Sequence, residues 1–491
     1  MSVTLSRSAA GSSVVAPKVA TQSPPPAPPS WWLTEALAAE GKVSECPPLH
    51  GETTADVAIV GGGYTGLWTA LALKERNPDL DIVVIEAEIC GAGASGMNGG
   101  KVHGYWASLE SMSTFLGGDG ALTVARAGAR AQDALRDFAQ TCGRDVWWRE
   151  GGSLRVSASV AQDRKLAGYV AAAKKLGVPD TAVGIPADDV QRRCASPVFR
   201  AGVYFPEGAT VHPARLVRAL RAIALARGIR IHERTRMEGY DPGPMTRIRI
   251  AGVQIRAREV VLATNVALIG ERHVRQHMTV FSSYAVMTEA APSLLAKVWP
   301  SEEGISDLRM FVHYFRKTPD GRVLMGSGSG PILHADNLLS PKLTRDRASA
   351  GRAAAGLRRL LPGLAGVPVA QSWGGAIDVA SDRLPYFGTL PGTRVHFGCG
   401  YSGHGVNATY IGGQCLASLV LGQKDEWSTL PLCTRERPRL PPEPFRYLGG
   451  NAIRWGIMNC EAAEEEGREG SGAARALAAL PRLLGMRIGT R

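Results

Sequence analysis

The chain has 491 residues and a mass of 52.0 kDa, more than the roughly 250 to 300 residues that one hydrophobic core supports, so at least two domains are expected. Its apolar runs fall short of the roughly 20 residues of a membrane-spanning helix, and its net charge of +12 is not gathered into the basic, aromatic-interleaved stripe of a nucleic-acid-binding surface. Its eight cysteines are scattered without zinc-type spacing, so we expect reduced thiols in the cytoplasm, no metal site, no nucleic-acid partner and no transmembrane segment.

The first 30 residues are predicted to be a disordered tail rich in proline and serine. The tail has no continuous apolar segment, which argues against a secretory signal. Its acid-poor, serine-rich composition also resembles an organellar transit peptide. Cytoplasmic location is therefore the main expectation, and an organellar location is the alternative.

Residues 56–86 contain the sequence pattern of a βαβ unit that binds a dinucleotide. A short apolar run leads into Gly61-x-Gly63-x-x-Gly66, a helical run follows, and a second apolar run ends at Glu86. In this pattern the first glycine permits a tight turn, the second lets the backbone approach a pyrophosphate, and the third allows close packing of helix and strand. Glu86 follows Gly66 by 20 residues, the spacing expected of the acid that accepts hydrogen bonds from the ribose hydroxyls.

A glycine-rich segment, residues 91–101, follows the second strand and is predicted to be a loop around the cofactor. It leaves the carboxyl end of a strand, where doubly wound sheets bind ligands, and its small residues leave backbone N–H groups accessible. A helix is then predicted for residues 121–140 and a strand-rich segment for 146–205. The next helix is predicted to begin at Pro213 and to end at Gly228.

The remainder is predicted to be mainly β, followed by a second glycine-rich turn. A hairpin is predicted at 246–256, a buried strand at 259–265, a β-rich stretch at 278–325 with a Pro-Asp-Gly turn, and a charged helix at 342–360. Residues 394–407 repeat the opening theme of strand, glycine-rich turn and helix. The two glycine-rich turns would converge on one ligand if both strands belong to one sheet.

We therefore expect an α/β fold: a doubly wound, Rossmann-like FAD-binding domain of the glutathione-reductase type with an inserted, mainly antiparallel β substrate domain. The FAD-binding domain is assigned to residues 50–145, 208–270 and 373–430. The substrate domain is assigned to 146–207 and 271–372, and a C-terminal extension to 431–491.

Six motifs in this order resemble those of a known family. They lie at residues 59–66, 93–101, 261–265, 314–322, 373–375 with 382–385, and 400–405. With them the chain resembles the FAD-dependent amine and amino-acid oxidoreductases of the D-amino acid oxidase superfamily, in particular the branch of gamma-glutamylputrescine oxidase. Residues 97 and 101 depart from the pattern of many relatives, because Met97 and Lys101 stand where Arg and Gln are usual, which leaves the substrate class open.

The resemblance implies that FAD is bound noncovalently, since the positions that match covalent attachment sites carry neither cysteine nor histidine. It also implies which residues contact the cofactor. These are Gly61, Gly63, Tyr64, Thr65, Gly66 and Glu86 at the ADP half; Ala94, Ser95, Asn98, Gly99, Gly100 and Lys101 at the ribityl chain and ring; Met237 at the adenine; Ala263 and Thr264 at the pyrophosphate; and Gly403, His404, Gly405 and Val406 at the pyrimidine edge.

The implied reaction is oxidation of a C–N bond. Hydride leaves the carbon that bears a neutral amino group, and the resulting imine is hydrolysed, so the protein must position that carbon and stabilise negative charge on the flavin. Lys101 and His404 are the candidate cations beside the ring. Arg316 is the candidate clamp for a substrate carboxylate, with a solvated arginine at a strand end as the competing interpretation. Tyr314, Tyr284, Trp106 and Tyr401 are further candidates for the pocket wall.

Other functions remain open at this point. The main prediction is an enzyme that oxidises a small-molecule amine or amino acid, with either O2 or a quinone as electron acceptor. The alternatives are a D-amino acid dehydrogenase that passes electrons to a quinone, and a flavin monooxygenase. The monooxygenase is disfavoured because its Gly-Asp turn is missing from residues 397–404. A nicotinamide-dependent dehydrogenase is disfavoured by the late glycine-rich turn, and only measured turnover would exclude a flavin-binding scaffold.

Overall fold

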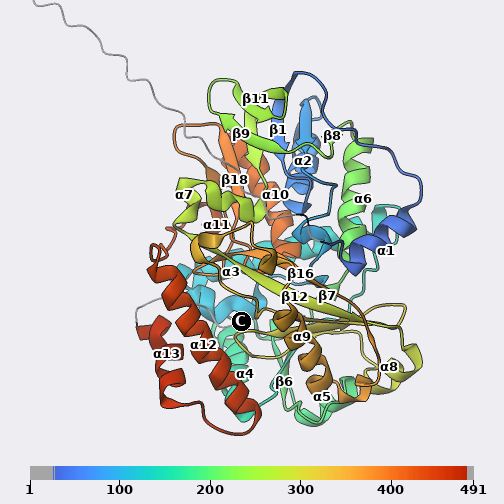
Figure 1. Ribbon diagram of the computed structural model, residues 1–491, viewed down its shortest axis with the longest axis vertical. Coiled ribbons are helices and arrows are strands. Elements are labelled where there is room, and N and C mark those ends of the chain that lie inside the picture. Colours follow the sequence, from blue (N-terminus) through green and yellow to red (C-terminus); the bar gives the residue numbers. More distant parts are fainter. Residues whose placement is uncertain (1–25, 27, 484–491) are drawn as a thin grey trace, which may run out of the picture.

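A computed structural model describes residue 26 and residues 28–483, and two large sheets organise this part of the chain (Figure 1). The first sheet carries the dinucleotide-binding pattern. The second is mainly antiparallel and lies below the first in the view of Figure 1. The predicted α/β class with an antiparallel second sheet is therefore confirmed.

The first sheet is assembled from distant parts of the chain. Its hydrogen-bonded neighbours follow the order β17-β18-β11-β1-β2-β8, and β9 and β10 extend it as an antiparallel meander from β11. Its strands are β1 (Thr53–Val60), β2 (Ile82–Ile85), β8 (Arg230–His232), β9 (Met237–Asp241), β10 (Thr246–Ile250), β11 (Val253–Leu262), β17 (Tyr386–Thr389) and β18 (Val395–Cys399). Because β1 pairs in parallel with β2 and β11, and β11 with β18, the carboxyl ends of these strands meet at one edge.

Alternation along β1 separates two apolar layers. Val57 and Ile59 pack with the helices of this domain, whereas Ala58 and Val60 pack against the side that includes β9 and β10. Successive side chains of a strand point to opposite faces, so a run in which every residue is apolar is buried on both sides. This accounts for the uninterrupted apolar sequence of the predicted first strand.

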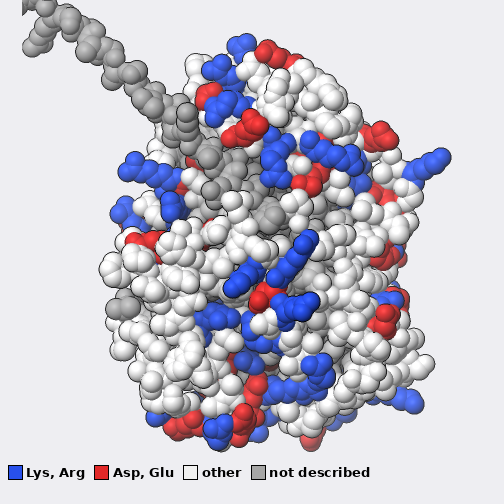
Figure 2. Space-filling view, viewed as in Figure 1, with Lys and Arg blue, Asp and Glu red and all other residues white. Residues whose placement is uncertain are grey.

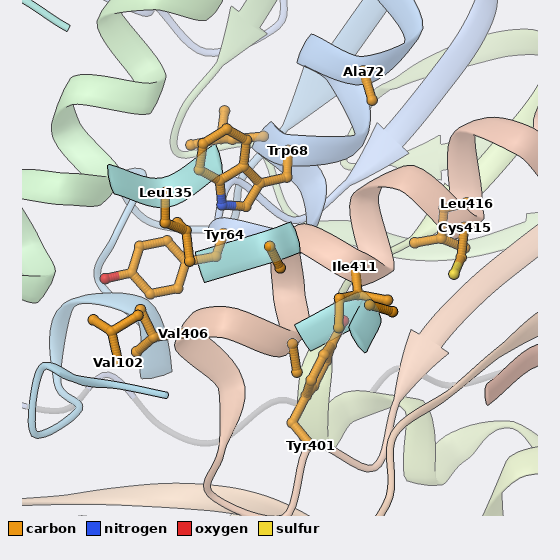
Figure 3. Close-up of a cluster of buried hydrophobic side chains, with 14 of the residues drawn as sticks. Tyr64, Trp68, Ala72, Val102, Leu135, Tyr401, Val406, Ile411, Cys415 and Leu416 are labelled. Carbon is orange, nitrogen blue, oxygen red and sulfur yellow. The ribbon is translucent and has the colours of Figure 1, made fainter. Parts of the chain in front are cut away.

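Two helices that begin at the carboxyl edge pack directly against each other. They are α2 (Tyr64–Arg76) and α10 (Gly405–Val420). Figure 3 shows Tyr64 and Trp68 of α2 in one buried cluster with Val406 and Ile411 of α10. A Cβ atom at Gly413 would lie only 2.6 Å from the Cβ atom of Trp68, so glycine permits this close approach.

The second sheet follows the order β16-β12-β15-β14-β13-β4-β6-β5, and only β13 and β4 pair in parallel. Its strands are β4 (Ser153–Val156), β5 (Val183–Ile185), β6 (Gly202–Phe205), β12 (Met278–Thr288), β13 (Gly304–Ser306), β14 (His313–Lys317), β15 (Val323–Ser327) and β16 (Val369–Ala380). One face is apolar and includes Leu154, Ile305 and Phe315, which pack with helix α9 (Arg347–Leu360). The opposite face is available to form the wall of a site.

The remaining elements connect the two sheets or cover them. The short strands β3 (Lys101–Val102) and β7 (Ala209–Thr210) pair with each other. The other helices are α1 (Trp31–Glu40), α3 (Leu109–Thr141), α4 (Val160–Lys175), α5 (Ala187–Arg193), α6 (Pro213–Ala226), α7 (Arg272–Arg275), α8 (Pro292–Val298), α11 (Pro431–Thr434), α12 (Phe445–Glu465) and α13 (Gly472–Leu483).

Two predicted elements are corrected. The segment 146–205 is less strand-rich than expected, because helices α4 and α5 lie between its strands. The helix predicted for 121–140 begins earlier, at Leu109, and bends at Gly117, where φ is 70°. The cluster of glycines at residues 117–120 obscures the helical pattern on its amino-terminal side. The helix predicted after Pro213 and the hairpin at 246–256 are confirmed.

Ser30, the last residue of the predicted disordered tail, belongs to the folded part of the chain, which corrects that boundary. Ser30 is buried, its Oγ caps α1 by accepting a hydrogen bond from the Leu33 N–H, and the same hydroxyl donates to the carbonyl of Gly96. The disorder predicted for residues 1–25 and 27 lies outside the described residues, as does the chain beyond residue 483. Among the helices that the structure describes, none is both long and apolar enough to cross a membrane.

Charged side chains of both signs lie on the surface (Figure 2). Figure 2 shows Lys and Arg side chains interspersed with Asp and Glu on the face in view. Many surface arginines lie in ion pairs, including Arg230 with Asp81 and Arg200 with Asp163. Exposed ion pairs of this kind contribute little to stability, and they are typical of a solvated protein surface.

Candidate cofactor and substrate site

A cavity of about 470 Å³ lies where the carboxyl edge of the first sheet meets the second sheet. Its lining includes Val60 and Ile85 at the ends of β1 and β2, and Ala263 directly after β11. From the second sheet it includes Arg155 and Tyr314. The edge of a doubly wound sheet and the polar face of an antiparallel sheet therefore enclose one site.

Glu86 directly follows β2 and lines the cavity. Its Oε2 accepts a hydrogen bond of 2.8 Å from the Gly62 N–H, and its Oε1 accepts one of 3.0 Å from the Glu88 N–H. Burial raises the pKa of the Glu86 carboxyl, and these two hydrogen bonds oppose that shift. The carboxylate retains further acceptor capacity for hydroxyl donors from a ligand in the cavity.

The fingerprint glycines hold backbone in close contact. A Cβ atom at Gly66 would lie 1.9 Å from the carbonyl oxygen of Gly61, so Gly66 serves helix packing and does not line the cavity. Gly61 has φ 115°, and a Cβ atom there would lie 2.5 Å from the Ala263 carbonyl oxygen. Both positions require glycine for steric reasons.

The glycine-rich loop at residues 91–101 is held in place by side chains from several elements. Ser95 Oγ accepts a hydrogen bond of 2.9 Å from the Tyr64 N–H at the start of α2. Asn98 Oδ1 accepts one of 2.8 Å from the Gly100 N–H. Trp373 of β16 donates from Nε1 to the Met97 carbonyl at 2.8 Å. These contacts hold the loop along the cavity wall.

Two helix amino-termini face the cavity. Tyr64 and Thr65 begin α2, Gly405 and Val406 begin α10, and all four residues line the cavity. The N-terminal N–H groups and the helix dipole favour negative charge. The arrangement suits a ligand that carries phosphate at one end and develops negative charge at the other.

The predicted cofactor residues are thus brought together with few exceptions. The cavity lining includes Gly61, Gly63, Tyr64, Thr65, Glu86, Ala94, Ser95, Asn98, Gly99, Lys101, Met237, Ala263, Thr264, Gly403, His404, Gly405 and Val406. Gly66 and Gly100 lie just behind this lining. Of the four aromatic candidates, Tyr314, Trp106 and Tyr401 line the cavity. Tyr284 does not: it is buried, and its hydroxyl donates to the Lys342 carbonyl.

Lys101 and His404 both lie on the cavity wall. Lys101 donates from Nζ to the Ile305 carbonyl at 3.1 Å, so it joins β3 to the second sheet. The His404 ring lies edge-on to the ring of His103, with 5.3 Å between centroids. Their predicted roles beside a flavin ring stay predictions.

The structure corrects the expectation that Arg316 faces the cavity. The side chain is fully buried and is absent from the lining. Its Nη1 donates to the carbonyls of Gly100 and Val211, and its guanidinium lies 5.3 Å from the centroid of the Trp32 ring. Burial lowers the pKa of Arg316 to about 9, and nearby Arg149 adds to the shift. Arg316 is therefore a structural cation beneath the glycine-rich loop.

Arg155 is the cation of the second sheet that does reach the cavity, and sequence reasoning missed it. Its Nη1 donates to the Tyr169 hydroxyl at 2.7 Å, and its guanidinium lies over the rings of Tyr169 and Phe205. The neighbouring residues Leu154 and Val156 belong to the apolar core on the other face. Strand alternation at residues 153–156 is the signal that would have identified it.

Two carboxyl groups of the cavity wall were also missed. Asp378 is buried, its Oδ2 accepts a hydrogen bond of 2.6 Å from the Gly400 N–H, and burial raises its pKa to about 7. Glu207 lies between β6 and β7, and burial likewise raises its pKa to about 7. No sequence motif marks either residue, because their surroundings come from distant segments.

The lining fits FAD on chemical grounds. The nucleotide end combines Glu86, which accepts hydrogen bonds, with the start of α2, which favours phosphate. At Gly63 a Cβ atom would lie 2.9 Å from Ser95 Oγ, and at Gly99 it would lie 2.7 Å from the Tyr314 ring. Glycine at these two positions lets the backbone pack closely against Ser95 and Tyr314, two side chains that also line the cavity.

Comparisons with known proteins agree with this geometry. The protein is similar to gamma-glutamylputrescine oxidoreductase of Escherichia coli (strain K12), with 27% identity over 85% of this chain and 93% of that protein. It is also similar to the probable oxidoreductase OrdL of Rhizobium meliloti (strain 1021), with 29% identity over 84% of this chain and 91% of that protein.

Among solved structures, glycine oxidase from Geobacillus kaustophilus is similar in fold, with a TM-score of 0.65, 20% identity, and coverage of 79% of this chain and 100% of that one. L-Proline dehydrogenase from P. horikoshii has a TM-score of 0.63 at 17% identity and covers 78% of this chain and 96% of that one. Residues 56–419 match the family described as FAD dependent oxidoreductase. The chain therefore belongs to the DAO family of FAD-dependent oxidoreductases, and FAD is its cofactor.

Proposed function

We propose that this enzyme oxidises the C–N bond of a small amine or amino acid and produces an imine that water hydrolyses. One observation carries the proposal: the cofactor-binding edge of the first sheet and the polar face of the second sheet line the same cavity. A substrate bound against the second sheet would lie beside a flavin bound at the first. When bound, FAD supplies the acceptor for the hydride.

The residues of the cavity wall would then position the substrate and stabilise negative charge on the flavin. Ser283 Oγ and the Tyr314 hydroxyl, 2.9 Å apart, present polar groups from β12 and β14 to the substrate side. Lys101 and His404 are proposed to stabilise negative charge at the flavin ring. Arg155 is now the candidate clamp for a substrate carboxylate, the role first predicted for Arg316. Its guanidinium belongs to the second sheet and lines the cavity.

The proposal is tested by the visible spectrum of the purified protein and its anaerobic bleaching. The panel would contain N-methyl amines, monoamines, diamines, and D- and L-amino acids. Bleaching by at least one amine or amino acid, with release of the matching aldehyde or oxo acid and of ammonia or an amine, is expected. A flavoprotein that no member of the panel bleaches would overturn the proposal.

The electron acceptor distinguishes an oxidase from a dehydrogenase. Passing electrons from a D-amino acid to a quinone is the second candidate. After anaerobic reduction, the rate of reoxidation by air-saturated buffer is compared with the rate in the presence of a soluble quinone. Reoxidation by O2 within the turnover time identifies an oxidase, and reoxidation only by the quinone identifies a dehydrogenase.

A further inference from the structure

Among the described residues, five with a carboxyl group line the cavity, and four of these carboxyl groups have partners in the structure. Glu86 accepts two backbone N–H groups at the nucleotide end, and Glu88 pairs with Arg236 at 3.1 Å. Asp307 pairs with His313 at 2.8 Å. Asp378 accepts the backbone N–H groups of Gly400 and Tyr401. The fifth, Glu207, has no ion-pair partner among the described residues.

Glu207 is nevertheless held in a fixed position. Its Oε1 accepts a hydrogen bond of 3.1 Å from the Gly104 N–H. Its backbone carbonyl accepts one of 3.0 Å from Gln132 Nε2 on α3, and Gln132 Oε1 in turn accepts one of 3.1 Å from Asn407 on α10. Its Oε2 accepts no hydrogen bond from the residues that the structure describes. One carboxylate oxygen is thus anchored and the other is available.

The surroundings of Glu207 belong to the substrate side of the cavity. The residue follows Phe205 of β6, which pairs in register with Ser153 of β4, and both Phe205 and Ser153 line the cavity. Partial burial raises the pKa of the carboxyl to about 7, and the nearest charges, Asp133 and Arg136 of α3, act in opposite directions. A cation in the cavity would restore the ionised form and satisfy the available oxygen.

From this arrangement we infer that Glu207 binds a second cationic nitrogen of the substrate, remote from the carbon that is oxidised. The substrate is then a diamine, a polyamine or another amine with a distal ammonium group. This inference rests on the proposed function and narrows its substrate class. Glu207 acts in it as a specificity residue, since it selects the substrate by charge and takes no part in hydride removal.

The test compares diamines with monoamines on the holoenzyme. Dissociation constants are measured from the change in the flavin spectrum under anaerobic conditions for α,ω-diaminoalkanes of three to eight carbons and for the 1-aminoalkanes of equal length. Initial rates are measured on the same compounds. In the wild type, at least one diamine is expected to bind about 10- to 100-fold more tightly than its monoamine, the range of one charge-assisted hydrogen bond.

The decisive variant is Glu207→Gln, which keeps the size of the side chain and its acceptor for the Gly104 N–H. It is expected to abolish the preference for the diamine while monoamine binding and the flavin spectrum stay unchanged. Glu426→Gln is the matched control, because Glu426 is exposed and lies in a surface ion pair with Arg130. This control is expected to retain the preference.

Other outcomes overturn the inference. These are the absence of any diamine preference in the wild type, a preference that survives in Glu207→Gln, or an equal loss for monoamine and diamine, which would place Glu207 at the reacting nitrogen. Bleaching by monoamines and diamines alike would refute the role of Glu207 and leave the proposed amine oxidation standing. Failure of every amine and amino acid to bleach the flavin would refute the proposed function itself.

Discussion

Tyr314 and Arg316 lie two residues apart on the same face of β14, yet only Tyr314 faces the cavity. The Tyr314 ring lies beside Gly99, whereas the Arg316 guanidinium is covered by the carbonyls of Gly100 and Val211. Two residues along one strand thus separate Tyr314 in the cavity wall from Arg316 in the protein interior. The glycine-rich loop is the boundary between them.

Replacing Arg316 by Met is expected to destabilise the protein and loosen the glycine-rich loop, because the Val211 carbonyl loses its donor and the Gly100 carbonyl keeps only the Val211 N–H. The expected cost is about 1 to 3 kcal/mol for the carbonyl that is left unpaired. A lower melting temperature and weaker FAD binding would follow, and kcat/KM would fall equally for an acidic substrate and its neutral amide. Arg192→Met, at an exposed position, serves as control. A loss of kcat/KM confined to the acidic substrate would instead support the first prediction, that Arg316 binds a substrate carboxylate.

Gly66→Ala is expected to disrupt the cofactor site, whereas Gly351→Ala, at an exposed position of α9 away from the cavity, is expected to be tolerated. A Cβ atom at Gly66 would lie 1.9 Å from the Gly61 carbonyl oxygen, and one at Gly351 meets nothing within 4 Å. Overpacking of this kind costs about 1 to 3 kcal/mol or more. Thermal unfolding and the FAD content of the two purified variants measure the difference. Equal stability of both variants would contradict the close packing of α2 on β1.

Glu86→Ala is expected to weaken FAD binding about 10- to 150-fold, because charge-assisted hydrogen bonds worth about 1.5 to 3 kcal/mol are lost. The measurement is a fluorescence titration of the apoprotein with FAD. Asp79→Ala is the control, since Asp79 is an exposed carboxylate just before β2. Unchanged affinity in a folded Glu86 variant would refute its role at the ribose.

Asp378 is expected to make the protein less stable as the pH rises from about 4 to about 7. Burial raises the pKa of Asp378 from 3.8 to about 7, so the folded state holds a proton that the unfolded state releases in this range. The stabilisation is fully present below pH 3.8 and is lost as the pH rises through 7. Asp378→Asn lacks this titration, so the difference in melting temperature between wild type and variant should change across this range. A constant difference would show that Asp378 is ionised throughout.

The purified protein is expected to be yellow and to release its FAD when it is precipitated with acid. Among the described residues no cysteine lines the cavity, and Cys399 is fully buried in the apolar core behind the late glycine-rich turn. The flavin in the supernatant and in the pellet is measured by absorbance and fluorescence. Flavin that stays with the pellet would indicate a covalent link, for which His103 and His404 on the cavity wall would be the first residues to examine.

The cofactor half of the site was accessible to sequence reasoning because its determinants are local. The glycines at 61, 63 and 66 and the acid at 86 lie within one βαβ unit, and their spacing alone carries the geometry. The order of six motifs then identified the family. Each of these signals reports on backbone shape, which a short segment can specify by itself.

The substrate half was less accessible because burial there depends on contacts between distant segments. Arg316 is covered by residues 32, 100 and 211, and no pattern near residue 316 reveals them. Glu207 lies in a turn with no motif, and its place on the cavity wall follows from contacts with α3 and Gly104. The alternation of apolar and polar side chains along β4 was the one sequence signal for this half of the site, and it identifies Arg155 as a residue on the cavity side of the strand.

Neighbouring strands of the first sheet lie far apart in the sequence, and this affects folding during translation. β1 pairs with β11, and β11 pairs with β18, so the sheet is incomplete until residue 399 has left the ribosome. At about 5 to 20 residues per second, the interval between the synthesis of β1 and of β18 is on the order of tens of seconds. Within that interval, β1 waits for β11 until residue 262 is made, and the end of β11 then waits for β18. Strand edges without a partner are sites of aggregation, so the first sheet is vulnerable until its last strand is made.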